Sequence, residues 1–558
     1  MTPRRDQRGV VAVVLLLSIL ALGASYYMVS RLEAMSMQAK AFERQHNAGV
    51  LNRAKQALIG YVAAQASKAY EDNPGALPCP EAAGYYDDPS NEGKTASSCT
   101  LPKVGRLPWR TLGLEKLLDY SGEPLWYVVS PGWARTSGNT LINANTIGQL
   151  SLDGTSGTDG DTIVALIIAP GPAMVVTAAT GCTAWTQSRP TSGTPDWRNY
   201  LECENATSPA DSSFVSTGPS TSFNDQVVKV TKADIMPGIE AAIANRIERE
   251  IAPLVKNVYA TSSWSLSSSN PVFPYPAPFA NPGTSTYQGS AGTTAGLLPV
   301  TSQACSGDPR CSSTFVAWNQ GITPTVQYTG GAADFDNLNC SFISSTEALC
   351  YAQYKNTGSM TVRMAARARN VAMALRKFDT TQVTAQSQVF GTWTNATVTS
   401  AAGTLNSDGS GTIYVNVSLP YSISNSYFYI VMDIGLLADL LDSTNSLTGW
   451  YVRNEWYRLT YYAVTSRHTA AVLPTSPACT TGVNCLSVTN VTPSGAQRAI
   501  LILAGRSINN ATRPSATLGD YLEFGNASGS YERQTVSSVV AAGLKRPFND
   551  RIVVVDTN

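Results

Sequence analysis

The sequence has little charge and almost no histidine. Charged residues make up 14 % of the 558 residues, against roughly 25 % in an average soluble protein. The 39 Lys and Arg balance the 39 Asp and Glu, which argues against nucleic acid as a partner because phosphate binding needs a basic excess or a basic face. The two histidines, His46 and His468, leave little room for a histidine-rich metal site or a histidine-based catalytic triad.

Common catalytic motifs are also missing. No Gly-x-Ser-x-Gly and no His-Glu-x-x-His occurs, so neither a nucleophile elbow nor a zinc protease helix is predicted. Gly93-Lys94-Thr95 ends like a phosphate-binding loop, but Asp88 stands where such a loop needs its first glycine. The sequence therefore predicts no enzyme and no cofactor.

The N-terminus has no proline between Pro3 and Pro74 and no charge from Val10 to Val29. Twenty residues in a helix span about 30 Å, enough to cross the hydrocarbon core of a membrane. Three arginines precede this segment against one aspartate, so the positive-inside rule keeps Met1 in the cytoplasm. The rest of the chain after Val29 is then expected on the far side of the membrane, anchored by a single pass.

Two other interpretations of this segment stay open. A secretory signal peptide has a shorter apolar region of about 7–15 residues, although Ala21-Leu22-Gly23-Ala24 could serve as its cleavage site. A plain signal anchor is the second. Beyond the segment an apolar stripe continues with helical spacing and predicts one helix of about 60 residues, with His46 as a packing residue; the stripe comprises Leu32, Met35, Ala39, Phe42, His46, Val50, Ala54, Leu58 and Val62.

The short basic leader ending in Gly9, the apolar segment and the amphipathic continuation together resemble the type IV pilins and pseudopilins. In that family a prepilin peptidase cuts after the glycine and methylates the new N-terminus, which implies cleavage between Gly9 and Val10. The fifth mature residue would be Val14, where major subunits carry a Glu that is thought to neutralise a neighbour's N-terminal amine. The first mature residue would be Val10 instead of the usual Phe.

The missing Glu favours a minor or tip subunit, because a buried carboxylate without its partner is costly. The largest minor pseudopilin of type II secretion systems similarly lacks this Glu and sits at the tip. The first part of the chain also resembles a group of large pilin-like proteins through Leu77-Pro78-Cys79-Pro80 and Leu107-Pro108-Trp109.

The rest of the chain contains an internal duplication. Several landmarks recur in the same order: Asn199–Thr207 with Asp520–Ser528, Phe223–Val230 with Phe548–Val555, Ile163–Gly171 with Ile500–Gly505, Gly113–Asp119 with Gly435–Asp442, and the proline-rich starts at Asn73 and Asn270. A helix precedes the second copy from Thr231, with Asp234 at capping-box spacing, and Pro253 is expected to kink or end it.

The second copy carries about 130 additional residues between Pro299 and Gly435. Alternating apolar residues at Val362–Ala368 and Ile413–Leu419 predict strands, and Asn406-Ser407-Asp408-Gly409 is typical of a hairpin turn. Insertion into a surface loop is a tolerated route to a new domain. We therefore expect a β-rich domain here.

With the resemblance, the expected fold class is α+β: a long membrane-spanning helix, two tandem pilin-like units of a helix and an antiparallel sheet, and the inserted β-rich domain. The expected boundaries are 1–9 for the prepilin leader, 10–29 for the transmembrane segment, 30–72 for the periplasmic continuation of the helix, 73–230 for the first head, 231–300 for the second helix and the start of the second unit, 301–432 for the insert and 433–558 for the remainder of the second head.

The ten cysteines fall into five sequence-neighbour pairs. They contain no Cys-x-x-Cys and no histidine companion, so a zinc site is not predicted. An even number beyond the membrane favours disulfides in an oxidising compartment. The neighbour pattern predicts Cys79–Cys99, Cys182–Cys203, Cys305–Cys311, Cys340–Cys350 and Cys479–Cys485.

Three further groups have a functional and a structural interpretation. Asp153, Asp159 and Asp161 lie in a glycine-rich stretch that could bind Ca²⁺ or form an ordinary solvated loop. Asp225 and Asp550 precede strands in both copies, which favours a turn role over catalysis. An aromatic cluster favours core packing over a sugar-binding platform; it comprises Trp450, Trp456, Tyr457, Tyr461 and Tyr462.

These observations predict a minor pilin or pseudopilin near the tip of a type IV filament, with its bulk in the periplasm or, once assembled, at the cell surface. Its expected partners are the inner membrane, other subunits through the N-terminal helix, prepilin peptidase, and a surface or secreted ligand of the insert. Two alternatives remain: a cargo-binding pseudopilin of a type II-like secretion system, and a membrane-anchored periplasmic enzyme that uses paired carboxylates.

Overall fold

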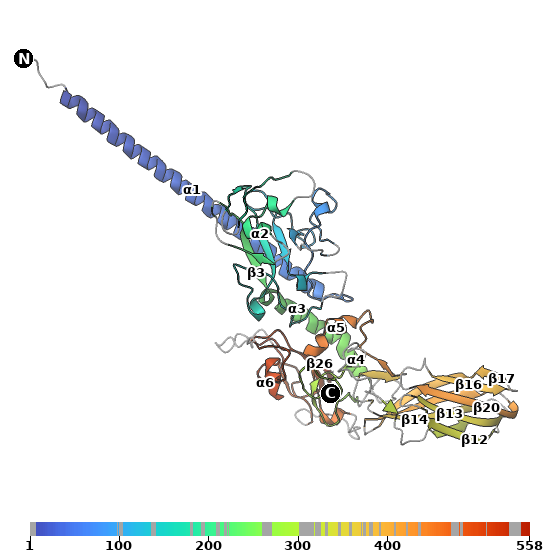
Figure 1. Ribbon diagram of the computed structural model, residues 1–558. Helices are drawn as coiled ribbons and strands as arrows, with labels where there is room; N and C mark the ends of the chain where they lie inside the picture. Colours follow the sequence, from blue (N-terminus) through green and yellow to red (C-terminus); the bar gives the residue numbers. More distant parts are fainter. Residues whose placement is uncertain are drawn as a thin grey trace, which may run out of the picture.

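The molecule is elongated, with the free end of α1 at one end and a β-sandwich at the other (Figure 1). The computed structural model describes residues 7–558 with the exception of short segments: 97–98, 100–103, 136–140, 179–181, 191–195, 208–211, 217–219, 221, 259–270, 301–316, 319–324, 330–332, 344–346, 357–359, 370, 372–374, 379–382, 390–391, 407–408, 420–421, 434–436, 470–478, 480–483, 509–510 and 535–547.

The N-terminal helix α1 runs without interruption over Gln7–Ala66. Its 60 residues make it about 90 Å long at 1.5 Å per residue. The helix ends a few residues before the expected boundary at 72. Tyr70 has a φ of 63°, a left-handed conformation in which a right-handed helix cannot continue.

The second half of α1 packs on a four-stranded antiparallel sheet. The sheet has the order β1-β2-β4-β8, with β1 at Val104–Arg106, β2 at Trp126–Val129, β4 at Ile163–Ala169 and β8 at Gln226–Thr231. Every residue of β4 is buried, because α1 and α3 cover one face of the sheet and Trp126, Tyr200 and Phe214 cover the other. A strand covered on both faces needs the continuous apolar run that β4 has.

A second helix leads into the second unit. Helix α3 covers Lys232–Arg246 and begins with the predicted capping box between Thr231 and Asp234. A π-helical turn, η5, follows at Ile247–Ile251, and α4 continues over Ala252–Asn257. Pro253 was expected to kink or end the helix. The α-helical pattern is interrupted at η5 directly before it, and Pro253 lies in the first turn of α4, where its missing N–H costs no intrahelical bond.

The second unit repeats the sheet of the first. Its sheet has the order β9-β22-β24-β26, with β9 at Ala295–Leu297, β22 at Thr460–Val464, β24 at Gln497–Leu503 and β26 at Arg551–Thr557. In both sheets the four strands stand in chain order and pair antiparallel. In both, a tyrosine hydroxyl of the second strand donates to a proline carbonyl: Tyr127 to Pro78 at 3.2 Å and Tyr462 to Pro274 at 3.1 Å.

The insert forms two five-stranded sheets at the end of the molecule remote from the free end of α1 (Figure 1). Buried apolar side chains of both sheets belong to one hydrophobic cluster. The first contains β10 (Ala317–Trp318), β11 (Thr325–Thr329), β14 (Met360–Arg369), β18 (Thr397–Leu405) and β19 (Gly411–Leu419); the second contains β12 (Ala333–Phe342), β13 (Glu347–Asn356), β16 (Thr384–Val389), β17 (Thr392–Asn395) and β20 (Ser422–Asp433). The predicted hairpin joins β18 to β19 and is closed by the hydrogen bond from Gly409 N to Asn406 O.

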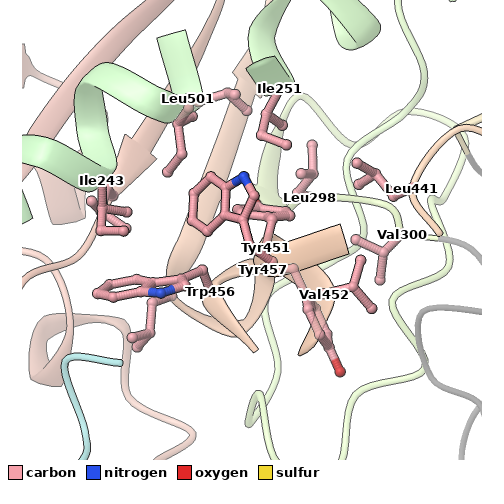
Figure 2. Close-up of a cluster of buried hydrophobic side chains, with 14 of the residues drawn as sticks. Ile243, Ile251, Leu298, Val300, Leu441, Tyr451, Val452, Trp456, Tyr457 and Leu501 are labelled. Atoms are coloured by element: carbon pink, nitrogen blue, oxygen red, sulfur yellow. The ribbon is translucent and has the colours of Figure 1, made fainter. Parts of the chain in front are cut away.

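The aromatic cluster of the second unit forms its core, as the packing interpretation predicts. Trp450, Trp456 and Tyr457 are buried. Figure 2 shows Trp456 and Tyr457 beside Tyr451 among apolar side chains from helix and strand, including Ile243, Ile251 and Leu501. These rings are therefore not a platform for a ligand.

Short elements complete the fold. They are η1 (Ala83–Tyr85), η2 (Pro131–Trp133), β3 (Ser151–Leu152), η3 (Asp159–Asp161), β5 (Val175–Val176), β6 (Trp185–Thr186), η4 (Trp197–Asn199), α2 (Cys203–Thr207), β7 (Ser213–Phe214), β15 (Arg376–Phe378), β21 (Leu437–Asp439), α5 (Gly449–Arg453), η11 (Trp456–Leu459), η12 (Ser466–His468), β23 (Val488–Thr489), η13 (Leu518–Asp520), α6 (Phe524–Ser528) and β25 (Tyr531–Glu532).

Candidate functional site

The first half of α1 leaves the body of the molecule (Figure 1). The large apolar side chains of this stretch are exposed: Val11, Val13, Val14, Leu15, Leu16, Leu17, Ile19, Leu20, Leu22, Tyr26, Tyr27, Met28, Val29, Leu32, Met35, Met37 and Phe42. Gly9 and Val10 lie in the backbone of this helix, and the surroundings of their side chains lie outside the described residues. Within the described chain, α1 is one helix long and apolar enough to cross a membrane, by length and composition.

The polar side chains of this segment are accommodated within the helix. Ser18 Oγ donates to Val14 O at 2.8 Å, and Ser30 Oγ donates to Tyr27 O at 2.9 Å. Such bonds satisfy hydroxyl groups where no water is present. Arg31 Nε donates to Tyr27 Oη at 2.9 Å, so an aromatic ring and a cation meet where the apolar run ends, a pairing typical of a membrane interface.

The predicted apolar stripe of α1 is exposed in the first part of the helix and buried where the helix packs on the body of the molecule. Ala54, Leu58 and Val62 are buried, whereas Leu32, Met35 and Phe42 are exposed. His46 was expected to pack on the stripe, but it is exposed, with Nε2 3.2 Å from Leu118 O and its ring edge-on to Tyr120. About half of the amphipathic face is therefore left uncovered by the chain itself.

The junction of α1 with the body is polar as well as apolar. Lys55 Nζ lies 2.8 Å from Asp234 Oδ2 and 3.1 Å from Lys229 O. The buried Asn47 Oδ1 accepts a hydrogen bond from Tyr120 N at 2.7 Å. These contacts link α1 to the sheet and to α3, so the helix and the first unit form one packed body.

Four of the five predicted cysteine pairs are joined. The disulfides are Cys79–Cys99, Cys182–Cys203, Cys340–Cys350 and Cys479–Cys485. Cys305 and Cys311 lie outside the described residues. Each bridge closes a short loop, which stabilises the fold chiefly by restricting the unfolded chain.

Of the three candidate calcium ligands, the structure describes the side chains of Asp153 and Asp161. Asp153 has a left-handed φ of 53° and accepts a hydrogen bond from Ser216 N at 2.7 Å. Asp161 is exposed at the end of η3, and the side chain of Asp159 lies outside the description. In the part of the chain that the structure describes, no group of three or more His, Cys, Asp or Glu could hold a metal ion.

Sequence reasoning missed a pair of carboxyl groups in the core of the first unit. Glu202 Oε2 accepts hydrogen bonds from Asn224 N at 3.0 Å and Asp225 N at 3.1 Å. Asp225 Oδ2 accepts in return from Glu202 N at 3.2 Å and Asn205 Nδ2 at 2.9 Å. Burial raises the pKa of Glu202 to about 7, and burial together with the charge of Glu202 raises the pKa of Asp225 well above its usual range.

The second unit repeats this pair. Glu523 Oε2 accepts from Asn549 N at 3.1 Å and Asp550 N at 3.2 Å, while Asp550 Oδ2 accepts from Glu523 N at 2.8 Å and Asn526 Nδ2 at 3.0 Å. Burial, followed by the charge of Glu523, raises the pKa of Asp550. The signal was present in the sequence, because both partners belong to the repeated landmarks that begin at Asn199 and Phe223.

A cavity of about 250 Å³ opens beside this pair in the first unit. Trp185, Arg198 and Cys203 line it together with Glu202. The side chain of Glu202 is buried, and Gln187, Asn224 and Asp225 already bond its oxygens. Since each pair ties the start of a strand to the start of a short helix, its role in both units is to hold that corner together.

Comparison with protein-family models, curated proteins and solved structures gives no match. Function has to follow from the residues and their arrangement.

Proposed function

We propose that this protein is a minor pilin or pseudopilin that lies at or near the tip of a type IV filament. The observation that carries the proposal is α1, a single helix whose first half is apolar and exposed and whose second half packs on an antiparallel sheet. Such a helix can pass from the membrane into a filament core without refolding, because the exposed stripe exchanges lipid for neighbouring helices.

The composition of the exposed half supports a terminal position. The described segment from Val11 to Val29 contains no acidic side chain, so it cannot neutralise the N-terminal amine of a neighbouring subunit inside the shaft. A subunit at the tip has no neighbour above it that needs this pair. The part of the chain beyond α1 is also large. It fits more easily at the end of a filament than in the shaft, because at the end it does not have to repeat along the filament.

The far end of the molecule supports a display function. The β-sandwich lies at the end opposite the free end of α1 (Figure 1), so a filament that holds α1 would present the sandwich outward. In this proposal the two sheet units act as a spacer, and the sandwich contacts a surface or partner. The secretion variant of the proposal, in which the ligand is cargo, predicts that deletion abolishes secretion and spares adhesion.

Processing of the N-terminus tests the proposal directly. When the full chain is coexpressed with prepilin peptidase, mass spectrometry should find a mature N-terminus at Val10 carrying one methyl group. The matched control is Gly9→Val, which removes the glycine at the cleavage position and should leave the leader attached. A wild-type chain that still begins at Met1 or Thr2 would contradict the pilin assignment.

A further inference from the structure

The outer face of one sheet of the sandwich carries a regular array of aromatic and amide side chains. Across strands β13, β20, β16 and β17, the backbone register aligns Tyr351, Tyr429, Gln386 and Asn395 in one row. In the neighbouring row Gln353 pairs with Tyr427 and Gln388 pairs with Trp393. With strands about 4.8 Å apart, four strands make a platform roughly 14 Å wide.

The alternation of the strands separates this array from the core. Cys350, Phe428 and Ile430 point inward and are buried, whereas their sequence neighbours point to the opposite side. The rings on the outer face are accessible, with Trp393 45 %, Tyr351 40 % and Tyr427 36 % exposed. The ring centroids of Trp393 and Tyr429 lie 5.2 Å apart, and the ring planes are tilted by 51° relative to each other. The two rings therefore lie side by side without being coplanar.

The amides of the platform are ordered by the same register. Gln386 Nε2 donates to Asn395 Oδ1 at 3.3 Å, and the hydroxyl of Tyr429 donates to Gln386 Oε1. These bonds hold the side chains in place between the rings. A bound molecule would therefore meet an organised pattern of donors and acceptors.

The platform also lacks charge among its described side chains, which are Tyr351, Gln353, Gln386, Gln388, Trp393, Asn395, Tyr427 and Tyr429. The other sheet of the sandwich differs. There Arg363 stacks on Tyr414 at 3.9 Å, and Arg367 Nε donates to Ser410 Oγ at 2.7 Å. Among the described side chains the two outer faces thus differ: the first exposes Trp393, Tyr351 and Tyr427, and the second carries Arg363 and Arg367.

We propose that this aromatic platform binds a neutral polysaccharide. The flat rings of Trp and Tyr match the apolar C–H faces of sugar rings, and their polar edges remain available for hydrogen bonds. Gln and Asn side chains both donate and accept, as hydroxyl groups require. The eight described side chains of the platform carry no charge, so a neutral ligand bound over them leaves no ion desolvated without a partner. The platform is wide enough to contact more than one sugar ring of an extended polysaccharide.

This inference rests on the proposed function for its biological setting, because a filament tip would carry the platform to a glycan-coated surface. Its physical basis is independent of processing and assembly. A purified chain should bind the glycan whether or not Gly9 has been cut. Failure of glycan binding and failure of cleavage can therefore be told apart.

The test uses the full chain in lipid nanodiscs prepared without sugar-based detergent. Cosedimentation with cellulose, chitin and mannan particles measures binding to neutral glycans, and alginate beads serve as the anionic probe. We expect Trp393→Ala to bind the retained neutral glycan about tenfold more weakly, with the ring-preserving Trp393→Phe losing less. Tyr414→Ala, a ring on the opposite face, is the matched control and should bind as the unmodified chain does.

Circular dichroism should show the same melting behaviour for the Trp393 variants and the parent, since the side chain is exposed. The proposal is overturned if none of the three neutral particles retains the chain, if Trp393→Ala binds as well as the parent, or if only alginate is bound. Capture by whole cells that survives enzymatic removal of their glycans would assign the face to a protein partner and would also overturn it.

Discussion

Asp225 and Glu202 meet in the core of the first unit, where Oδ1 of Asp225 has no hydrogen-bond donor among the described residues. In an unfolded chain both carboxyl groups ionise near pH 4, whereas in the folded protein the pKa of Glu202 is about 7 and that of Asp225 is raised further from its usual range. Between about pH 4 and about pH 7 the folded state therefore binds more protons than the unfolded chain does. The resulting stability is fully present below about pH 4 and is lost as the pH rises through about 7.

The substitution Asp225→Asn should remove much of this pH dependence. The amide keeps an oxygen for Glu202 N and Asn205 Nδ2 and places an N–H group where the unpartnered oxygen was. We expect the free energy of unfolding at pH 8 to increase by about 1–2 kcal/mol with little change at pH 4. Urea unfolding at both pH values measures this. Asp161→Asn, an exposed carboxylate in the same unit, is the control, and an unchanged pH slope in Asp225→Asn would rule out the pair as its source.

At the scale of the element, α1 has one sequence pattern and two environments. Leu58 is 0 % exposed against the first sheet, whereas Leu32, on the same predicted stripe, is 66 % exposed. Periodicity indicates that one face of a helix is apolar, but it does not specify what covers that face. In α1 the protein itself covers the second half and leaves the large apolar side chains of the first half exposed.

Replacing leucine by alanine at Leu58 and at Leu32 distinguishes a side chain that packs within the protein from one that does not. Leu58→Ala should lower the free energy of unfolding by about 2–4 kcal/mol, because it removes buried methyl groups and leaves a cavity. Leu32→Ala should leave the unfolding of the isolated chain unchanged within about 0.5 kcal/mol and reduce its incorporation into filaments. Chemical denaturation and filament immunoblotting measure the two effects. Equal losses of stability at both sites would show that Leu32 packs within the monomer.

At the scale of the whole molecule, a polar junction joins the two sheet units. Asn454 of the second unit donates from Nδ2 to Asp72 O at 2.7 Å and accepts at Oδ1 from Ile142 N at 3.2 Å. Asn143 Nδ2 donates to Asn454 O at 2.9 Å. Nearby, the buried Arg246 bonds Glu250 and lies 4.0 Å from the ring of Trp450. Polar contacts thus join the two sheet units at this junction.

Asn454→Ala should weaken this junction. It removes the bond to Asp72 and leaves the Ile142 N–H buried without an acceptor, which costs about 1–3 kcal/mol. We expect scanning calorimetry to resolve two transitions in the variant where the parent gives one, and limited proteolysis to cut faster between the units. Asn145→Ala, exposed on the adjacent loop, is the matched control. A variant that still melts in one transition at the parental temperature would show that the apolar contacts alone couple the units.

The sequence by itself predicted the long apolar helix, sheets in the rest of the chain and four cysteine pairs that are joined. Local spacing is enough for these features, since apolar period, capping residues and neighbouring cysteines act over short stretches of chain. Tertiary structure alone decided which apolar faces are covered and which polar groups meet. Glu202 and Asp225 come together across 23 residues, and Tyr351, Tyr429 and Trp393 share a face only once four strands adopt one register. These depend on pairing between distant segments, which no local pattern encodes.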